Sequence, residues 1–144
     1  MGVFQNPPDE EIGELLRRVH AIAVVGLSPR TNRPSHGVAA QMQRFGYRII
    51  PVRPAVESVL GEKAYAALRE VPDQFDLVNV FRAPQYVGKI VEECIALSAP
   101  AIWLQEGVVN ISAAERAQQA GMTVVMDRCV YREYLRLFGP VPHP

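Results

Sequence analysis

The chain has 144 residues, 49% apolar and 21% charged, and its 15 basic residues balance its 15 acidic ones. A chain of this length is expected to form one domain over residues 1–144. Surfaces that bind nucleic acids or membranes usually carry excess positive charge, so a formal charge of zero predicts neither kind of surface. No segment reaches the ~18 apolar residues of a membrane span and no secretory leader is visible, which predicts a cytoplasmic protein.

The predicted elements alternate between helices and short apolar strands. An N-terminal helix is expected at 8–20, because its apolar residues recur at helical spacing. Strands are expected at 21–25, 48–52, 77–81, 101–104 and 123–126. Helices are expected at 35–45, 64–68, 84–97, 112–120 and 130–138, and the tail at 139–144 is expected to be flexible.

Strands that are apolar on both faces and separated by helices are typical of a parallel sheet covered on both sides. The predicted fold class is α/β, with a Rossmann-like, doubly wound, mainly parallel five-stranded sheet and helices on both faces. In such a sheet the ligand lies outside the carboxyl ends of the strands. The residues that directly follow each strand are therefore the candidate site residues.

The loop after the first strand is the predicted phosphate site. Gly26 ends the strand, and a polar loop with Ser28, Pro29 and Arg30 leads to Ser35, the predicted N-cap of the next helix. A glycine turn before a helix N-terminus presents free N–H groups and the positive end of the helix dipole. The dinucleotide fingerprint G-x-G-x-x-G is absent, because no second glycine follows Gly26 at the required spacing.

The ends of the other strands supply further polar residues. Arg53 and Pro54 follow the second strand, where an NAD-binding fold has an acidic residue for the ribose. A cation there favours a phosphorylated ribose, as in coenzyme A (CoA) or NADP. The later strand ends carry Phe81, Arg82, Gln105 and Glu106. The cations expected at this edge, suited to an anion with several phosphates, are Arg30, Arg33, Arg53, Arg82 and Arg128.

Several motifs, taken together and in order, resemble those of the small stand-alone CoA-binding proteins. These proteins are similar to the N-terminal domain of the succinyl-CoA synthetase alpha subunit and of the NDP-forming acyl-CoA synthetases. The likeness covers nearly all of residues 10–138. The motifs that carry it include Val25-Gly26-Leu-Ser28-Pro29, Asn32-Arg33-Pro34-Ser35, Pro51-Val-Arg53-Pro54, Gly61-Glu-Lys-Ala-Tyr65, Phe81-Arg82, Ile102-Trp-Leu-Gln105 and Met126-Asp-Arg-Cys129.

The resemblance implies a role for each candidate residue. The pyrophosphate of CoA would meet Gly26, Ser28, Pro29, Arg30 and Ser35. The adenosine part would meet Arg53, Pro54, Phe81 and Arg82, whereas Gln105 and Glu106 would lie nearer the thiol. The family usually has Val-Asn-Pro where this chain has Val52-Arg53-Pro54.

No catalytic set can be assembled from the sequence, and nothing matches the phosphohistidine loop or the grasp domain of the synthetases. We therefore interpret the chain as a non-catalytic binder of CoA or acyl-CoA that acts as a carrier, a sensor or the partner of an enzyme on another chain. Three alternatives stay open. They are an NADP-dependent oxidoreductase, a nucleotide-sensing regulator, and chemistry on CoA thiols or disulfides through Cys129, which lies beside Arg128 near a predicted helix start.

Overall fold

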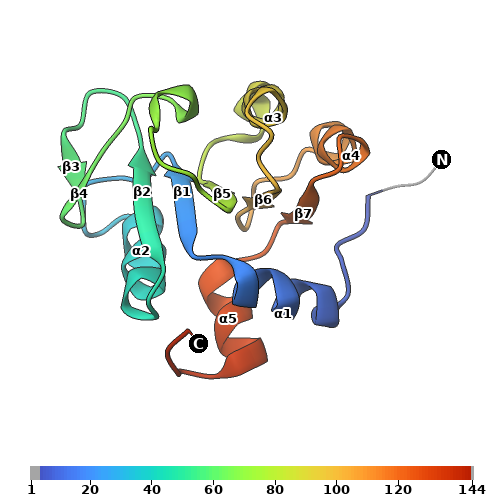
Figure 1. Ribbon diagram of the computed structural model, residues 1–144, viewed down its shortest axis with the longest axis horizontal. Helices are drawn as coiled ribbons and strands as arrows, with labels where there is room; N and C mark the ends of the chain where they lie inside the picture. The colour runs from blue at the N-terminus through green and yellow to red at the C-terminus, as the bar shows by residue number, and fades with distance from the viewer. Residues whose placement is uncertain (1–3, 144) are drawn as a thin grey trace.

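The computed structural model describes residues 4–143 and contains a five-stranded parallel sheet in the order β2-β1-β5-β6-β7 (Figure 1). This confirms the predicted Rossmann-like α/β class. The strand bounds match the expected ones, except that the third strand of this sheet ends one residue earlier. The strands are β1 (Ala21–Val25), β2 (Arg48–Val52), β5 (Leu77–Val80), β6 (Ala101–Leu104) and β7 (Thr123–Met126).

Helices cover both faces of the sheet, as expected. One face carries α1 (Asp9–Arg18), α2 (Pro34–Arg44) and α5 (Val130–Phe138), and the other carries α3 (Val87–Ala96) and α4 (Ile111–Gln119) (Figure 1). Successive side chains of β1 enter the two apolar clusters alternately, and all of its residues are buried. Two buried faces explain why the strands are continuously apolar in the sequence.

The connection from β2 to β5 differs from the prediction. The helix expected at 64–68 is wrong, because the chain forms a small hairpin of β3 (Ser58–Val59) and β4 (Glu62–Lys63) and then a 3-10 turn, η1 (Leu68–Glu70). Tyr65 instead lies extended along β2, where its N–H donates to the Pro51 carbonyl and its carbonyl accepts from the Arg53 N–H. The helix expected at 84–97 likewise begins as a 3-10 turn, η2 (Pro84–Tyr86), before α3.

Both edges of the sheet are covered by other segments. Tyr65 lies along the outer edge of β2, and the Asn6 side chain lies against β7 at the opposite edge. The Asn6 amide accepts a hydrogen bond from the Met126 N–H at 2.7 Å and donates one to the Met126 carbonyl at 2.9 Å. One side chain therefore pairs with the edge strand as a neighbouring strand would.

The C-terminal tail, expected to be flexible, makes specific contacts in its described part. Tyr134 Oη donates to the Val141 carbonyl, and the His143 N–H donates to the Phe45 carbonyl at 2.7 Å. The His143 ring also packs edge-on against Tyr47. These contacts hold the tail beside α2 and α5, on the side of the molecule away from the carboxyl ends of the strands (Figure 1).

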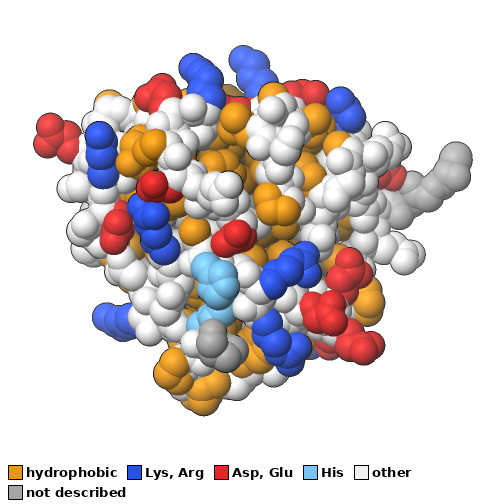
Figure 2. Space-filling model, viewed as in Figure 1, with side chains coloured by type: hydrophobic (Ala, Val, Ile, Leu, Met, Phe, Trp, Pro, Cys, Tyr) orange, Lys and Arg blue, Asp and Glu red, His pale blue; other side chains and the backbone are white. Residues whose placement is uncertain are grey.

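The surface shown in Figure 2 carries scattered charges of both signs, and several acidic side chains lie together at its lower right. Within residues 4–143, no helix is long and apolar enough to cross a bilayer.

Candidate functional site

A cavity of about 1080 Å³ opens at the carboxyl ends of the strands. It lies beside the point where the strand order reverses between β1 and β5, which is where ligands bind in open α/β sheets. Its volume is near the upper end of the range for small-molecule sites, about 300–1,000 Å³. Of the residues predicted at the site, Arg82 and Arg128 do not line it. Those that line it are Gly26, Ser28, Pro29, Arg30, Arg33, Ser35, Arg53, Pro54, Phe81, Gln105 and Glu106.

Gly26 joins the first and third strand ends of the site. Its φ is +86°, and a Cβ built on it would lie 2.4 Å from the Phe81 carbonyl oxygen. The Gly26 N–H donates to the Val52 carbonyl at 2.9 Å, so the turn is also fixed to the end of β2. Only glycine combines this backbone angle with so close an approach.

The loop after Gly26 is held by two serine hydroxyls. Ser28 N–H donates to Ser35 Oγ at 3.0 Å, and Arg30 N–H donates to Ser28 Oγ at 3.1 Å. Ser35 is not the N-cap that we expected, because α2 begins at Pro34 and the cap position is Arg33. Proline is favoured at the first helical position, since it has no N–H to satisfy and its φ is already helical. The Ser35 N–H has no acceptor among residues 4–143, as is usual in a first helical turn.

Three arginines in this part of the cavity have no carboxylate partner in the part of the chain that the structure describes. Arg30, Arg33 and Arg53 form no ion pair within the described residues, and Arg53 makes only a long, 3.4 Å hydrogen bond from Nη1 to the Gly26 carbonyl. Six other arginines are each paired with a carboxylate. The cavity thus gathers uncompensated positive charge next to a helix N-terminus, which favours an anionic ligand.

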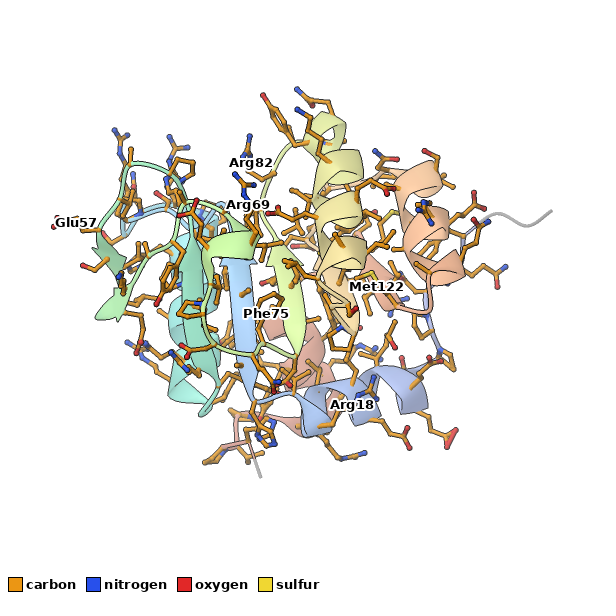
Figure 3. The ribbon with its side chains drawn as sticks, turned by 45° about the horizontal axis from the view of Figure 1, so that its top comes forward. Arg18, Glu57, Arg69, Phe75, Arg82 and Met122 are labelled. Carbon is orange, nitrogen blue, oxygen red and sulfur yellow. The ribbon has the colours of Figure 1, made fainter. Side chains whose placement is uncertain are left out.

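Arg82 does not line the large cavity. Its guanidinium lies 4.1 Å from the centre of the Tyr86 ring, so the side chain is turned toward η2. It lines instead a neighbouring hollow of about 450 Å³, which shares Gly26, Arg53 and Pro54 with the large cavity. Figure 3 shows Arg82 at the carboxyl end of the sheet, with Arg69 nearby. Arg82 therefore shares a hollow with Arg53 but not with Arg30 or Arg33.

Arg128 also departs from the expected set of cations. Its Nη1 donates to Glu133 Oε1 at 3.2 Å, and Arg136 bonds the same carboxylate and that of Asp9. The pKa of Glu133 is held below its usual range, chiefly by the hydrogen bonds from Arg136. Arg128 thus belongs to an ion-pair cluster between α1 and α5.

The opposite end of the cavity is largely uncharged. Gln105 follows β6 and is buried, and Val108, Cys129 and Tyr131 line the wall around it. At the mouth, Glu106 accepts from Arg132 Nη1 at 2.9 Å, so the charges of these two residues balance. The cavity therefore has a cationic end beside α2 and a neutral end beside α5.

Sequence reasoning missed the lining residues that come from loops and helix starts: Val38, Ala55, Val56, Val108, Tyr131 and Arg132. The last two lie just beyond the residues considered after the fifth strand of the sheet. Including the first turn of the helix that begins at Val130 would have found these two residues.

The two cysteines lie in different surroundings. Cys129 lines the cavity at the N-cap position of α5, with 7% of its surface exposed. Cys94 belongs to the buried face of α3, and this burial raises the pKa of its thiol to about 12. Only Cys129 is placed to meet a ligand in the cavity.

A family model described as a CoA binding domain matches residues 20–134, which is most of the chain. The chain belongs to the CoA-binding domain family. This confirms the resemblance noted from the motifs. The uncharacterized protein YneT of Bacillus subtilis is 45% identical to this CoA-binding domain protein over 127 residues, which cover 88% of the chain and 94% of YneT.

More distant relatives are parts of synthetases. The ADP-forming acetate–CoA ligase I of Archaeoglobus fulgidus is 28% identical over 92 residues, which cover 64% of this chain and only 13% of the ligase. Among solved structures, a hypothetical protein from Pyrococcus horikoshii superposes with a TM-score of 0.89 at 35% identity, covering 96% of this chain and all of that one. The CoA-binding domain protein thus matches small proteins over their full length and synthetases over a short segment.

Proposed function

We propose that this protein binds CoA or acyl-CoA in the cavity at the carboxyl ends of the strands. The observation that carries the proposal is the group of three arginines next to the N-terminus of α2, which have no carboxylate partner among residues 4–143. CoA has a pyrophosphate and a 3′-phosphate, so its adenosine end needs several cationic contacts close together. Family membership supports CoA over other nucleotides with the same charge.

The unequal distribution of charge along the cavity orients the ligand. The pyrophosphate lies against Arg30, Arg33 and the first turn of α2, and Arg53 binds the 3′-phosphate. The pantetheine arm carries no charge and runs across the ends of β5 and β6 toward Gln105. Val108 and Tyr131 supply apolar contact for this part.

The proposed role is non-catalytic: a carrier, a sensor or a partner of an enzyme on a separate chain. The carboxylate in the cavity lining, Glu106, is paired with Arg132 rather than placed to transfer a proton.

Calorimetric titration with CoA, dephospho-CoA and NADPH tests the proposal. CoA should bind at sub-millimolar concentration and more tightly than dephospho-CoA, which lacks the 3′-phosphate. Arg53→Ala should remove this difference and weaken CoA binding about 10- to 100-fold, the range for hydrogen bonds to charged groups. Arg44→Ala is the matched control, because Arg44 is an exposed arginine in the last turn of α2, outside the cavity.

Two outcomes would contradict the proposal. If CoA does not bind at sub-millimolar concentration, the site serves another ligand. If NADPH binds more tightly than CoA, the site prefers NADPH, and the result favours the alternative of an NADP-dependent oxidoreductase.

A further inference from the structure

A buried hydrogen-bond network fixes the side chain of Gln105. Asn79, in the middle of the sheet and 2% exposed, donates from Nδ2 to the Trp103 carbonyl at 3.3 Å and to Gln105 Oε1 at 3.1 Å. The backbone N–H of Val130 donates to the same Oε1 at 3.0 Å. Gln105 is therefore held from below by β5 and from the side by the first residue of α5.

Backbone groups decide which way both amides face. The Val130 N–H can only donate, so the Gln105 atom beside it must be the oxygen. The Trp103 carbonyl can only accept, so the Asn79 atom beside it must be the nitrogen. A flip of either amide would bring two donors or two acceptors together, so the orientation is fixed by the fold.

This orientation leaves Gln105 Nε2 as a donor without a protein partner. Nε2 has no acceptor among residues 4–143, and it is not sealed in the interior, although the residue is only 5% exposed. Gln105 lines the large cavity at its neutral end. A buried, rigid side chain thus offers one N–H₂ group to a bound molecule, and an acceptor there would gain a hydrogen bond with little loss of side-chain freedom.

The thiol end of CoA reaches this position if the phosphates lie where we propose. Gln105 is two strands from β1, which is roughly 10 Å across the sheet at about 4.8 Å per strand. The uncharged pantetheine arm is the part of CoA that fits an uncharged wall. At its end a free thiol offers only a weak acceptor, whereas a thioester offers a carbonyl oxygen.

We propose that Gln105 Nε2 donates a hydrogen bond to the thioester carbonyl of acyl-CoA, so that the site distinguishes acyl-CoA from CoA without an acyl group. This inference rests on the proposed CoA site. It assigns to Asn79 a positioning role, because Asn79 touches Gln105 and not the ligand.

The test compares acetyl-CoA with ethyl-CoA, a thioether of nearly the same size that lacks the carbonyl, by calorimetry at constant salt. The wild-type protein should bind acetyl-CoA about fivefold more tightly, the value of one ordinary hydrogen bond. Gln105→Glu keeps an acceptor for Val130 and Asn79 but replaces the N–H₂ group with an oxygen. This variant should lose or invert the preference for acetyl-CoA.

The outcomes separate this inference from the proposed function. Equal binding of the two ligands by the wild-type protein overturns the inference and leaves CoA binding intact. A preference that persists in Gln105→Glu also overturns it, because another donor would then bind the carbonyl. Failure of the wild-type protein to bind either ligand overturns both. The wild-type comparison decides the matter even if the variant does not fold.

Discussion

Replacing Gly26 with alanine tests how tightly the first strand end packs against the third. The added Cβ would lie 2.4 Å from the Phe81 carbonyl oxygen and 3.1 Å from Arg82 Cδ. The arginine can turn aside, but the carbonyl belongs to the backbone directly after β5. The substitution must therefore push apart two neighbouring strand ends at the edge of the cavity.

Two costs add in this variant. A left-handed backbone angle costs a residue with a Cβ about 1–2 kcal/mol, and overpacking a well-filled site costs about 1–3 kcal/mol. We expect the free energy of unfolding to fall by about 2–5 kcal/mol, a large part of the roughly 5–15 kcal/mol typical of a domain. CoA affinity should fall as well, because the Gly26 turn links the loop to Arg53.

Urea denaturation of the wild type, Gly26→Ala and Gly37→Ala measures these effects. Gly37 is an exposed helical residue in α2 whose Cβ would meet no atom within 4 Å, so alanine there should stabilise the protein by about 0.5–1 kcal/mol. A loss of less than 1 kcal/mol in Gly26→Ala would show that the close approach to Phe81 does not exist in solution.

Three further predictions concern the core, the ion pairs and the thiols. Trp103→Phe removes the 2.8 Å hydrogen bond from Nε1 to the Arg128 carbonyl. Urea denaturation should show that the free energy of unfolding falls by about 1–3 kcal/mol. An unchanged free energy would mean that water replaces the donor. The pKa of Glu133 is lowered in the fold, so its stabilising effect is present above the usual glutamate pKa of 4.5 and is lost as the pH falls below it. Wild-type stability should thus fall more steeply between about pH 5 and 3 than that of Glu133→Gln, and parallel curves would refute this. Iodoacetamide at pH 8 should modify Cys129 before Cys94, because burial raises the pKa of the Cys94 thiol to about 12. Saturating CoA should slow the reaction at Cys129, which lines the cavity. Mass spectrometry of the peptides measures the order of modification, and earlier modification of Cys94 would contradict the prediction.

The strands and the position of the site could be predicted from the sequence because both follow from burial on two faces. Residues after a parallel strand meet at one edge whatever the details of the loops. Gly26, Arg53 and Gln105 follow three different strands and accordingly line one cavity. Their meeting depends only on the order of the elements, which apolar periodicity indicates well.

What the sequence did not reveal depends on contacts between distant segments. The run from Ala64 to Leu68 is rich in helix-forming residues, yet Tyr65 pairs with β2, and tertiary pairing outweighs a weak local propensity. Arg128 was expected at the ligand because it follows a strand, but Glu133, five residues further along, accepts a hydrogen bond from it. The hydrogen bond between Asn79 and Gln105 joins two strands that are distant in the sequence, so no local sequence pattern predicts it.

The side chain of Asn6 has a consequence for how copies of this chain behave at high concentration. Without it, Met126 would offer a free N–H and a free carbonyl at the outer edge of β7, where a strand of another molecule could pair and begin an aggregate. Asn6 and Met126 are 120 positions apart in the sequence, so we expect this contact to form late in folding, since the loop that it closes is long. Expression of a form that starts after Asn6 should therefore give a protein with the same sheet but a greater tendency to associate, visible in light scattering as a rise in mass with concentration.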